Sequence, residues 1–234
     1  MTNNPEGSFW EHLDELRTVI VRILVVTLLF AVVAFCFKDE LFAVVLAPKS
    51  DIKLINTELT QQFIIHMKVA FFAGFLVASP YILYQLFRFI SPALYADERR
   101  YVVRVCGGGY LMFLVGVLFS YLVVFPFIID FLGNYQVDES VENTITLDSY
   151  ISTLFAMTLT LGLVFEMPVL SWLFAKLGFL KAEYMTRYRR HAIVAIVAIA
   201  AVITPTTDVF TLMVVSVPMY LLYELSVFIV RRSA

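Results

Sequence analysis

Long apolar stretches alternate with short polar ones along the whole chain, and this pattern predicts membrane-spanning helices. A helix needs about 20 apolar residues to cross a hydrocarbon core of ~30 Å. We expect helices at approximately 18–37, 69–87, 105–129, 149–175, 192–204 and 209–230. The chain is therefore predicted to be an all-α integral membrane protein, in which residues 1–234 form a single six-helix membrane domain.

The fifth and sixth predicted helices are expected to be short. Only 14 residues separate Arg190 from Pro205, which is roughly 21 Å of helix at ~1.5 Å per residue. The sixth segment carries Glu224, sixteen residues after Asp208, so its uncharged part is short as well. Short spans thin the bilayer locally or recruit partner helices. The alternative is a re-entrant pair that packs inside the bundle.

Composition and charge agree with a membrane protein and predict its orientation. The chain is 61% hydrophobic and 15% charged, whereas soluble domains are about half apolar and a quarter charged. With the N-terminus in the cytoplasm, 13 of the 17 Lys and Arg residues lie on the cytoplasmic side and four lie outside. The positive-inside rule therefore predicts that both termini are cytoplasmic.

Glu166 is the charged residue that stands out in the fourth apolar segment. It is the one carboxylate between Asp148 and Lys176, where no basic side chain stands either, and it lies ten residues from Lys176. A carboxylate at that depth is costly, and such residues usually face a polar cavity or a partner. Pro168 follows two residues later and is expected to bend the helix or weaken its hydrogen bonds. We predict that Glu166 faces a membrane-embedded cavity; the alternative is a buried hydrogen bond to a neighbouring helix.

Two glutamates on the predicted cytoplasmic face have no base three or four residues after them in the sequence. Glu15 precedes the first apolar segment, and Glu98 follows the second. A carboxylate binds a guanidinium group through two parallel hydrogen bonds, so a pair of glutamates suits a dibasic ligand. The alternative is that both are ordinary acids at solvated helix ends.

Signatures of enzymes and of cofactor binding are weak. The histidines lie in different parts of the chain, and no G-x-S-x-G, H-E-x-x-H or phosphate-loop motif is present. We expect no catalytic residue, no metal site, no cofactor and no nucleic-acid partner. The three glycines at 107–109 lack the Lys-Ser/Thr of a phosphate-binding loop, and we expect them to permit close helix packing.

Several motifs resemble those of one family, TatC, the receptor subunit of the twin-arginine translocase. Residues 11–17 read EHLDELR, 79–85 read SPYILYQ, and 89–95 read FISPALY. The fourth segment contains FEMP at 165–168, and the last outer loop, 204–210, begins Thr-Pro and ends Asp-Val-Phe. The resemblance covers essentially the whole chain, in order.

The resemblance implies six helices in a concave, cupped arrangement within the bacterial cytoplasmic (inner) membrane. It also implies a function: export of folded proteins, driven by the proton motive force, without enzymatic activity of the chain itself. Cargo proteins in this family carry an N-terminal signal peptide with paired arginines. The expected partners are therefore twin-arginine signal peptides, single-span TatA and TatB subunits, the lipid bilayer, and further copies of the chain.

Matching the motifs residue by residue assigns roles to particular side chains. Glu15 and Glu98 would grip the arginine pair, and Arg17 and Phe89 would flank them. Glu166 would face the concave side within the membrane. The set expected for docking of single-span partners lies around the last outer loop: Thr204, Pro205 and Thr211. Some relatives have Gln where Thr211 stands, so the hydrogen-bonding reach is shorter here.

Two other classes of function fit parts of the sequence. An ion- or proton-coupled secondary transporter could use Glu166 as a membrane-embedded relay. Such transporters more often show repeated halves, whereas the apolar segments here differ in length. A structural scaffold for single-span proteins fits everything except the two cytoplasmic glutamates.

Overall fold

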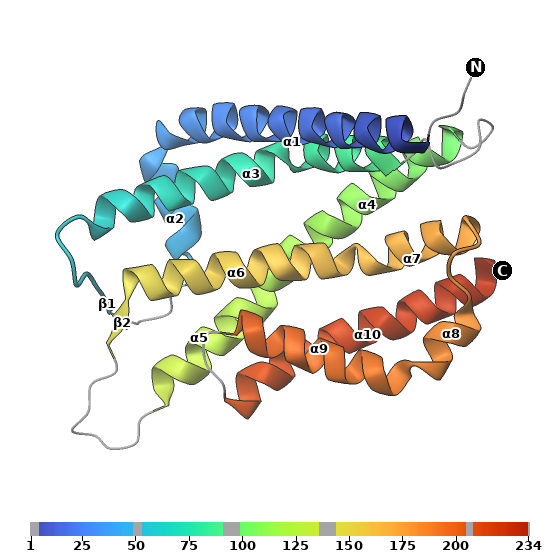
Figure 1. Ribbon diagram of the computed structural model, residues 1–234. Coiled ribbons are helices and arrows are strands. Elements are labelled where there is room, and N and C mark those ends of the chain that lie inside the picture. The colour runs from blue at the N-terminus through green and yellow to red at the C-terminus, as the bar shows by residue number, and fades with distance from the viewer. Residues whose placement is uncertain (1–4, 49–52, 91–98, 136–143, 205–207, 234) are drawn as a thin grey trace. The chain divides into compact units, whose positions relative to one another are not determined.

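The structure is a computed structural model that describes residues 5–48, 53–90, 99–135, 144–204 and 208–233. At residues 5–12, 90, 99–104, 134 and 233 it describes the backbone alone. Figure 1 shows that this part of the chain is almost entirely helical. The elements in chain order are α1 (Pro5–Phe35), α2 (Lys38–Leu46), β1 (Leu54–Ile55), α3 (Gln61–Ile90), α4 (Arg99–Phe119), the π-helix η3 (Ser120–Val124), α5 (Phe125–Asn134), β2 (Ile145–Thr146), α6 (Leu147–Phe165), α7 (Met167–Lys176), α8 (Ala182–Arg187), α9 (Arg189–Ile203) and α10 (Val209–Ser233).

Five stretches of the described chain are long and apolar enough to cross a membrane. They are Leu13–Phe35, Gln61–Phe89, Val105–Gly133, Leu147–Lys176 and Val209–Arg232. Each overlaps one of the predicted helices, so the prediction of an all-α integral membrane protein is confirmed in outline. The arrangement of all six helices and the cytoplasmic placement of the termini stay predictions.

The two helices predicted to be short differ in the structure. Helix α9 has 15 residues, or about 22 Å at ~1.5 Å per residue, and is not among the five spans, as expected. Helix α10 has 25 residues and qualifies as a span, so the prediction that it is short was wrong. The uncharged stretch ends at Glu224, but the helix continues past this residue, whose carboxylate pairs with Arg189.

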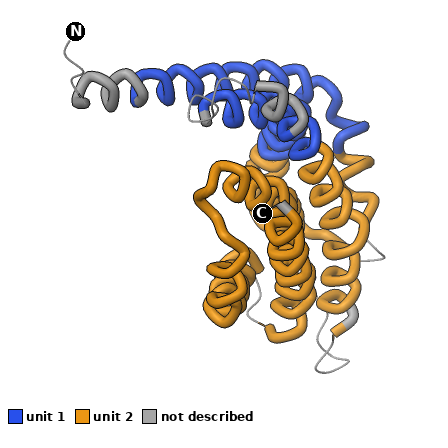
Figure 2. Tube along the Cα trace, turned by 90° about the vertical axis from the view of Figure 1, so that its right-hand side faces the viewer, with its two compact units in different colours: residues 1–41, 66–110 blue, residues 42–65, 111–234 orange. Residues whose placement is uncertain are grey.

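The described contacts divide the chain into two compact units (Figure 2). Unit 1 comprises Met1–Leu41 and His66–Tyr110, and unit 2 comprises Phe42–Ile65 and Leu111–Ala234. The single six-helix domain predicted from the sequence stays a prediction.

In unit 1, helices α1 and α3 pack at very short range around Gly74. A Cβ atom built on Gly74 would lie 2.4 Å from the backbone nitrogen of Ala31 and 2.7 Å from its Cα. Only glycine allows two helix backbones to approach this closely. Nearby, the rings of Phe35 and His66 stack with their centroids 4.0 Å apart.

Helix α3 continues through Pro80, which has no N–H to donate to the carbonyl of Leu76. The hydroxyl of Ser79 donates to that carbonyl instead, at 2.7 Å. A neighbouring Ser therefore replaces the hydrogen bond that proline removes, as membrane helices require when no water is present.

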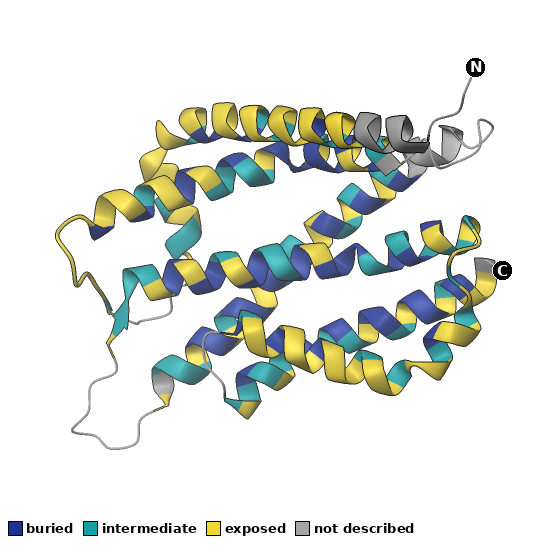
Figure 3. Ribbon diagram, viewed as in Figure 1, coloured by how far each residue is buried: buried dark blue, intermediate teal, exposed yellow. Residues whose placement is uncertain are grey.

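In unit 2, helix α10 is the central element and contacts α6, α7, α8 and α9. Its buried apolar side chains are Val215, Met219, Leu222, Tyr223, Val227 and Val230. Figure 3 shows the resulting buried stripe on α10, whereas much of α9 is exposed. The exposed side chains of α9 are mainly apolar, which suits a helix surrounded by lipid.

The third span is irregular at η3 because Pro126 stands at the start of α5. The N–H of Phe125 reaches back five residues to the carbonyl of Ser120, which makes one π-helical turn. Just before this turn, Gly116 lies against α6, where an added Cβ would be 2.8 Å from the carbonyl oxygen of Leu161. Glycine thus allows close packing here as it does at Gly74.

The sequence did not predict the small elements of the loops. Helix α2 ends where two tyrosine hydroxyls donate to its last carbonyls, Tyr121 to Val44 at 2.5 Å and Tyr150 to Val45 at 3.3 Å. Strands β1 and β2 pair in parallel, two residues each. The expected packing at the glycines 107–109 is not found at Gly107 or Gly108, whose added Cβ atoms would have no neighbour within 4 Å among the residues that the structure describes.

These glycines provide a matched test of the helix contact in unit 1. We expect Gly74→Ala to lower the apparent unfolding temperature of the detergent-solubilised protein, because overpacking against the Ala31 backbone costs about 1–3 kcal/mol. Gly107→Ala makes the same change where space is open, so it should be neutral or stabilising, since alanine favours helix by up to ~1 kcal/mol. Equal effects of the two substitutions would contradict the close approach of α1 and α3.

Candidate functional site

Helix α1 carries two of the residues predicted to bind the ligand, Glu15 and Arg17, and both are exposed. Thr18 lies one helical turn after Asp14 in α1, and its hydroxyl donates to the carbonyl oxygen of Asp14 at 2.9 Å. Side chains two positions apart do not share a face of a helix. Glu15 and Arg17 therefore project in different directions from the same end of α1.

Phe89 lies at the last turn of α3 and is half-buried. In unit 1, Ala31 contacts Gly74 and Phe35 contacts His66, so α1 and α3 run antiparallel. Glu15 and Phe89 each lie 15 to 16 residues from the Ala31–Gly74 contact, which is roughly 22–24 Å along either helix.

The antiparallel register places Glu15, Arg17 and Phe89 at the same end of the α1–α3 pair, which is also where the N-terminus of α1 and the C-terminal end of α3 meet in Figure 1. Three residues that are distant in the sequence thus come to one end of one unit. Glu98, the fourth predicted member of this group, lies outside the described residues.

Glu166 stands at the break between α6 and α7, with Pro168 in the first turn of α7. The predicted helix defect is confirmed. A helical hydrogen bond nevertheless spans the break between α6 and α7: the N–H of Leu170 donates to the carbonyl of Glu166 at 2.9 Å. The side chain is 3% exposed, and neither carboxylate oxygen has a hydrogen-bond partner among the described residues.

The neighbourhood of this break in unit 2 is mostly aromatic and aliphatic. The ring of Phe165 lies 5.6 Å from that of Phe119. The hydroxyls of Ser120 and Thr158, both buried, lie 3.4 Å apart and eight residues or more from Glu166 in the sequence. Whether Glu166 faces a cavity, as the sequence suggested, stays a prediction.

The predicted docking threonines lie inside unit 2. Thr204 is 4% exposed, and its hydroxyl donates to the carbonyl of Ala200 at 3.0 Å. Thr211 is fully buried; its N–H donates to the carboxylate of Asp208 at 2.7 Å, which caps α10. The Thr211 hydroxyl has no partner among the described residues. Pro205 lies outside them.

One polar cluster was missed in the sequence. Arg189, at the start of α9, donates to the Glu224 carboxylate of α10 at 2.7 Å, and the hydroxyl of Tyr220 donates to the same carboxylate at 3.0 Å. The hydroxyl of Tyr223 donates to the carbonyl of Met185 in α8 at 2.7 Å. A lone glutamate late in an apolar segment and a run of basic residues before the preceding segment were the available signals, but pairing them required the fold.

Metal binding has no support in the described chain, where no group of three or more His, Cys, Asp or Glu side chains could hold an ion. The arrangement instead offers exposed carboxylate and guanidinium groups at one helix end and a buried carboxyl within a span. Such groups can bind a charged peptide or a polar segment within the membrane, by the chemistry of charge-assisted hydrogen bonds.

Comparison with known proteins identifies the family. The family model described as Sec-independent protein translocase protein (TatC) matches residues 11–218. The chain belongs to the TatC family. TatC proteins are components of a protein translocase, a transport role rather than an enzymatic one.

Individual TatC proteins match this chain over nearly its full length. The Sec-independent protein translocase protein TatC of Koribacter versatilis is 38% identical over 94% of this chain and 83% of its own length. TatCy of Bacillus subtilis is 35% identical over 97% of this chain and 89% of its own length. The crystal structure of the twin-arginine translocase receptor TatC superposes with a TM-score of 0.83 at 33% identity, covering 95% of this chain and 99% of that one.

The burial of Glu166 yields a test of its energetic cost. A buried polar group without a hydrogen-bond partner costs roughly 1–3 kcal/mol, so Glu166→Met should raise the apparent unfolding temperature of the solubilised protein. Leu163→Met, on the exposed side of the same turn, is the control and should have little effect. A clear loss of stability in Glu166→Met would show that the carboxyl has a partner in the folded protein.

Proposed function

We propose that this chain is the receptor and core subunit of a twin-arginine translocase. It would bind the paired-arginine signal peptide of folded cargo and assemble single-span TatA and TatB subunits for export driven by the proton motive force. It would do so in the bacterial cytoplasmic (inner) membrane, with both termini in the cytoplasm. The observation that carries the proposal is the meeting of Glu15, Arg17 and Phe89 at one end of the α1–α3 pair in a member of the TatC family.

The chemistry of this end suits a signal peptide with two arginines. The carboxylate of Glu15 is exposed and can accept two parallel hydrogen bonds from a guanidinium group. In the proposal, Glu98 receives the second arginine, and Phe89 offers an apolar surface to the residues that follow. The positive charge of Arg17 repels the arginines of the signal peptide from its side of the helix and so directs them towards Glu15.

Docking of single-span subunits is proposed at the outer surface of α9 and the first half of α10. Thr204 and Thr211 are buried, so they would support this surface from within, and Pro205 would set the turn between the helices. The contact itself would involve exposed apolar side chains such as Val202, Met213 and Val217. The short α9 supports the proposal, since a span shorter than the hydrocarbon core favours association with other helices.

An ion- or proton-coupled secondary transporter is the second candidate. The observation that favours it is Glu166, a buried carboxyl within a span whose oxygens have no partner among the described residues. In the translocase, the same residue would admit water or a polar part of the signal peptide into the membrane. Glu166→Gln keeps a polar side chain but removes its ionisation. If Glu166 is a proton relay, Glu166→Gln should abolish transport. If Glu166 provides polarity in a cavity, Glu166→Gln should retain more transport than Glu166→Ala.

Substitution of Glu15 tests signal-peptide binding directly. We expect Glu15→Ala to weaken photo-crosslinking of a twin-arginine signal peptide by about 10- to 100-fold, the value of one hydrogen bond to a charged group, ~1.5–3 kcal/mol. Asp14→Ala removes the neighbouring exposed carboxylate and should change binding by less than about threefold, because exposed charges off the site contribute little.

A peptide with both arginines replaced by Gln provides the second control. It should bind wild type and Glu15→Ala equally weakly, because the contact that the substitution removes is already absent. If Glu15→Ala reduces the binding of both peptides alike, the glutamate supports the fold of α1 rather than the ligand.

Cysteine crosslinking tests the docking surface. Met213→Cys, exposed by 56% in wild type, should form disulfides with a single-span subunit that carries a cysteine in its span. Leu28→Cys on α1 has a similar exposure of 59% and should form far fewer. Crosslinks confined to position 28 would move the docking surface from α10 to α1.

A further inference from the structure

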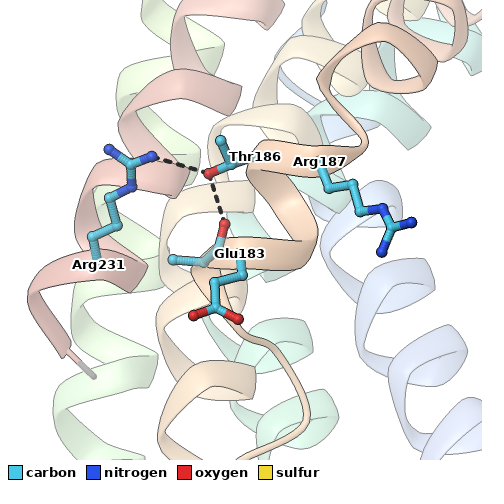
Figure 4. A pocket seen from close by; sticks show the side chains of 5 residues that line it. Glu183, Thr186, Arg187 and Arg231 are labelled. Atoms are coloured by element: carbon cyan, nitrogen blue, oxygen red, sulfur yellow. Dashed lines mark hydrogen bonds between the residues drawn. The ribbon is translucent and has the colours of Figure 1, made fainter.

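An open pocket of about 550 Å³ lies between α8 and the last turn of α10, away from every residue assigned above. Its lining residues are Ala182, Glu183, Thr186, Arg187 and Arg231. Figure 4 shows Arg231 reaching from α10 to Thr186 of α8, with Glu183 on the adjacent turn of this short helix, whereas the side chain of Arg187 extends from the other side of α8, away from Arg231. The pocket therefore joins two elements of unit 2 and presents both signs of charge.

The position of the pocket along the chain places it at the level of lipid headgroups. One candidate span ends at Lys176, shortly before α8, and another ends at Arg232, next to Arg231. Chain segments just beyond the ends of spans lie in the polar interface of the bilayer. A ligand for this pocket is thus most available as the headgroup of a lipid.

The charged groups of the pocket do not neutralise one another. An Nη of Arg231 donates to the hydroxyl of Thr186 at 3.1 Å, and that hydroxyl donates to the carbonyl of Ala182 at 2.8 Å. The side chain of Glu183 makes no hydrogen bond or ion pair with any described residue. A guanidinium group with N–H donors to spare, that of Arg231, and an available carboxylate therefore share one pocket.

We propose that this pocket binds the zwitterionic headgroup of a phosphatidylethanolamine. The phosphate accepts hydrogen bonds from Arg231, since a guanidinium fork matches phosphate oxygens. The ammonium donates to the carboxylate of Glu183. A purely anionic headgroup offers no cation to the Glu183 carboxylate, and its negative charge is repelled by that carboxylate. A choline headgroup is a quaternary ammonium, so it has no N–H to donate to Glu183.

The surface next to the pocket suits the acyl chains of the same lipid. Leu221, Leu225 and Phe228 are all exposed, and their spacing of four and three residues places them on one face of α10 that leads to Arg231. At the end of this face, the guanidinium of Arg232 lies over the Phe228 ring, 4.8 Å from its centroid. The apolar stripe thus continues from the pocket along the membrane span.

Native mass spectrometry of the solubilised protein with added lipids tests the site. We expect wild type to retain phosphatidylethanolamine about tenfold more strongly than phosphatidylcholine of the same acyl chains, the value of one charge-assisted contact. Glu183→Gln should abolish this preference. Arg231→Gln should reduce the retention of both lipids about tenfold. Arg190→Gln removes an exposed positive charge outside the pocket lining and should change retention by less than about threefold.

Four results would overturn the proposal: a wild-type preference for phosphatidylglycerol, a preference for ethanolamine that survives Glu183→Gln, equal losses in Arg231→Gln and Arg190→Gln, or displacement of the lipid by equimolar soluble phosphoethanolamine. The unfolding temperature of each variant is measured alongside. If Arg231→Gln does not fold, the lipid preference of Glu183→Gln decides alone.

Discussion

The ion pair between Arg189 and Glu224 is the interaction on which the C-terminal half of this protein depends. The two charges are 2.7 Å apart, and Tyr220 adds a third polar group to the same carboxylate. A single acid in a membrane helix is costly, but a paired and hydrogen-bonded one is much less so. Helix α10 runs through Glu224 without a break, and the ion pair connects it to the start of the short α9, which packs against it.

The irregular points of the long helices have a common physical logic. Membrane helices tolerate proline only where the lost hydrogen bond is replaced or redirected. The Ser79 hydroxyl replaces the bond near Pro80, a π-turn precedes Pro126, and the helix is interrupted at Glu166 before Pro168. Glycine acts in the opposite way and permits close contact, at Gly74 in unit 1 and Gly116 in unit 2.

The sequence predicted the helices well because hydropathy and proline act locally. The spans, the break at Glu166 and the short α9 follow from residues close together in the chain. The partner of Glu224 could not be predicted in the same way, since Arg189 lies 35 residues away from it in the sequence. The burial of Thr204 and Thr211, like the open surroundings of Gly107 and Gly108, depends on which helices pack together.

The candidate site shows the same division. Glu15, Arg17 and Phe89 were found from sequence motifs, and the α1–α3 register brings them to one end of unit 1. Glu166 was recognised from its depth alone, but its lack of a hydrogen-bond partner among the described residues is a property of the packed helices. The pocket between α8 and α10 has no sequence signature, since it forms between two elements that are distant in the chain.

Export of a folded fluorescent cargo tests the central claim most directly. The protein is expressed with its single-span partner subunits in bacterial cells that lack their own twin-arginine receptor. The account predicts that a cargo with paired arginines in its signal peptide crosses the membrane, whereas the same cargo with two glutamines stays in the cytoplasm. Export of both cargoes at equal rates, or of neither while the protein is present and folded in the membrane, would contradict a role as twin-arginine receptor.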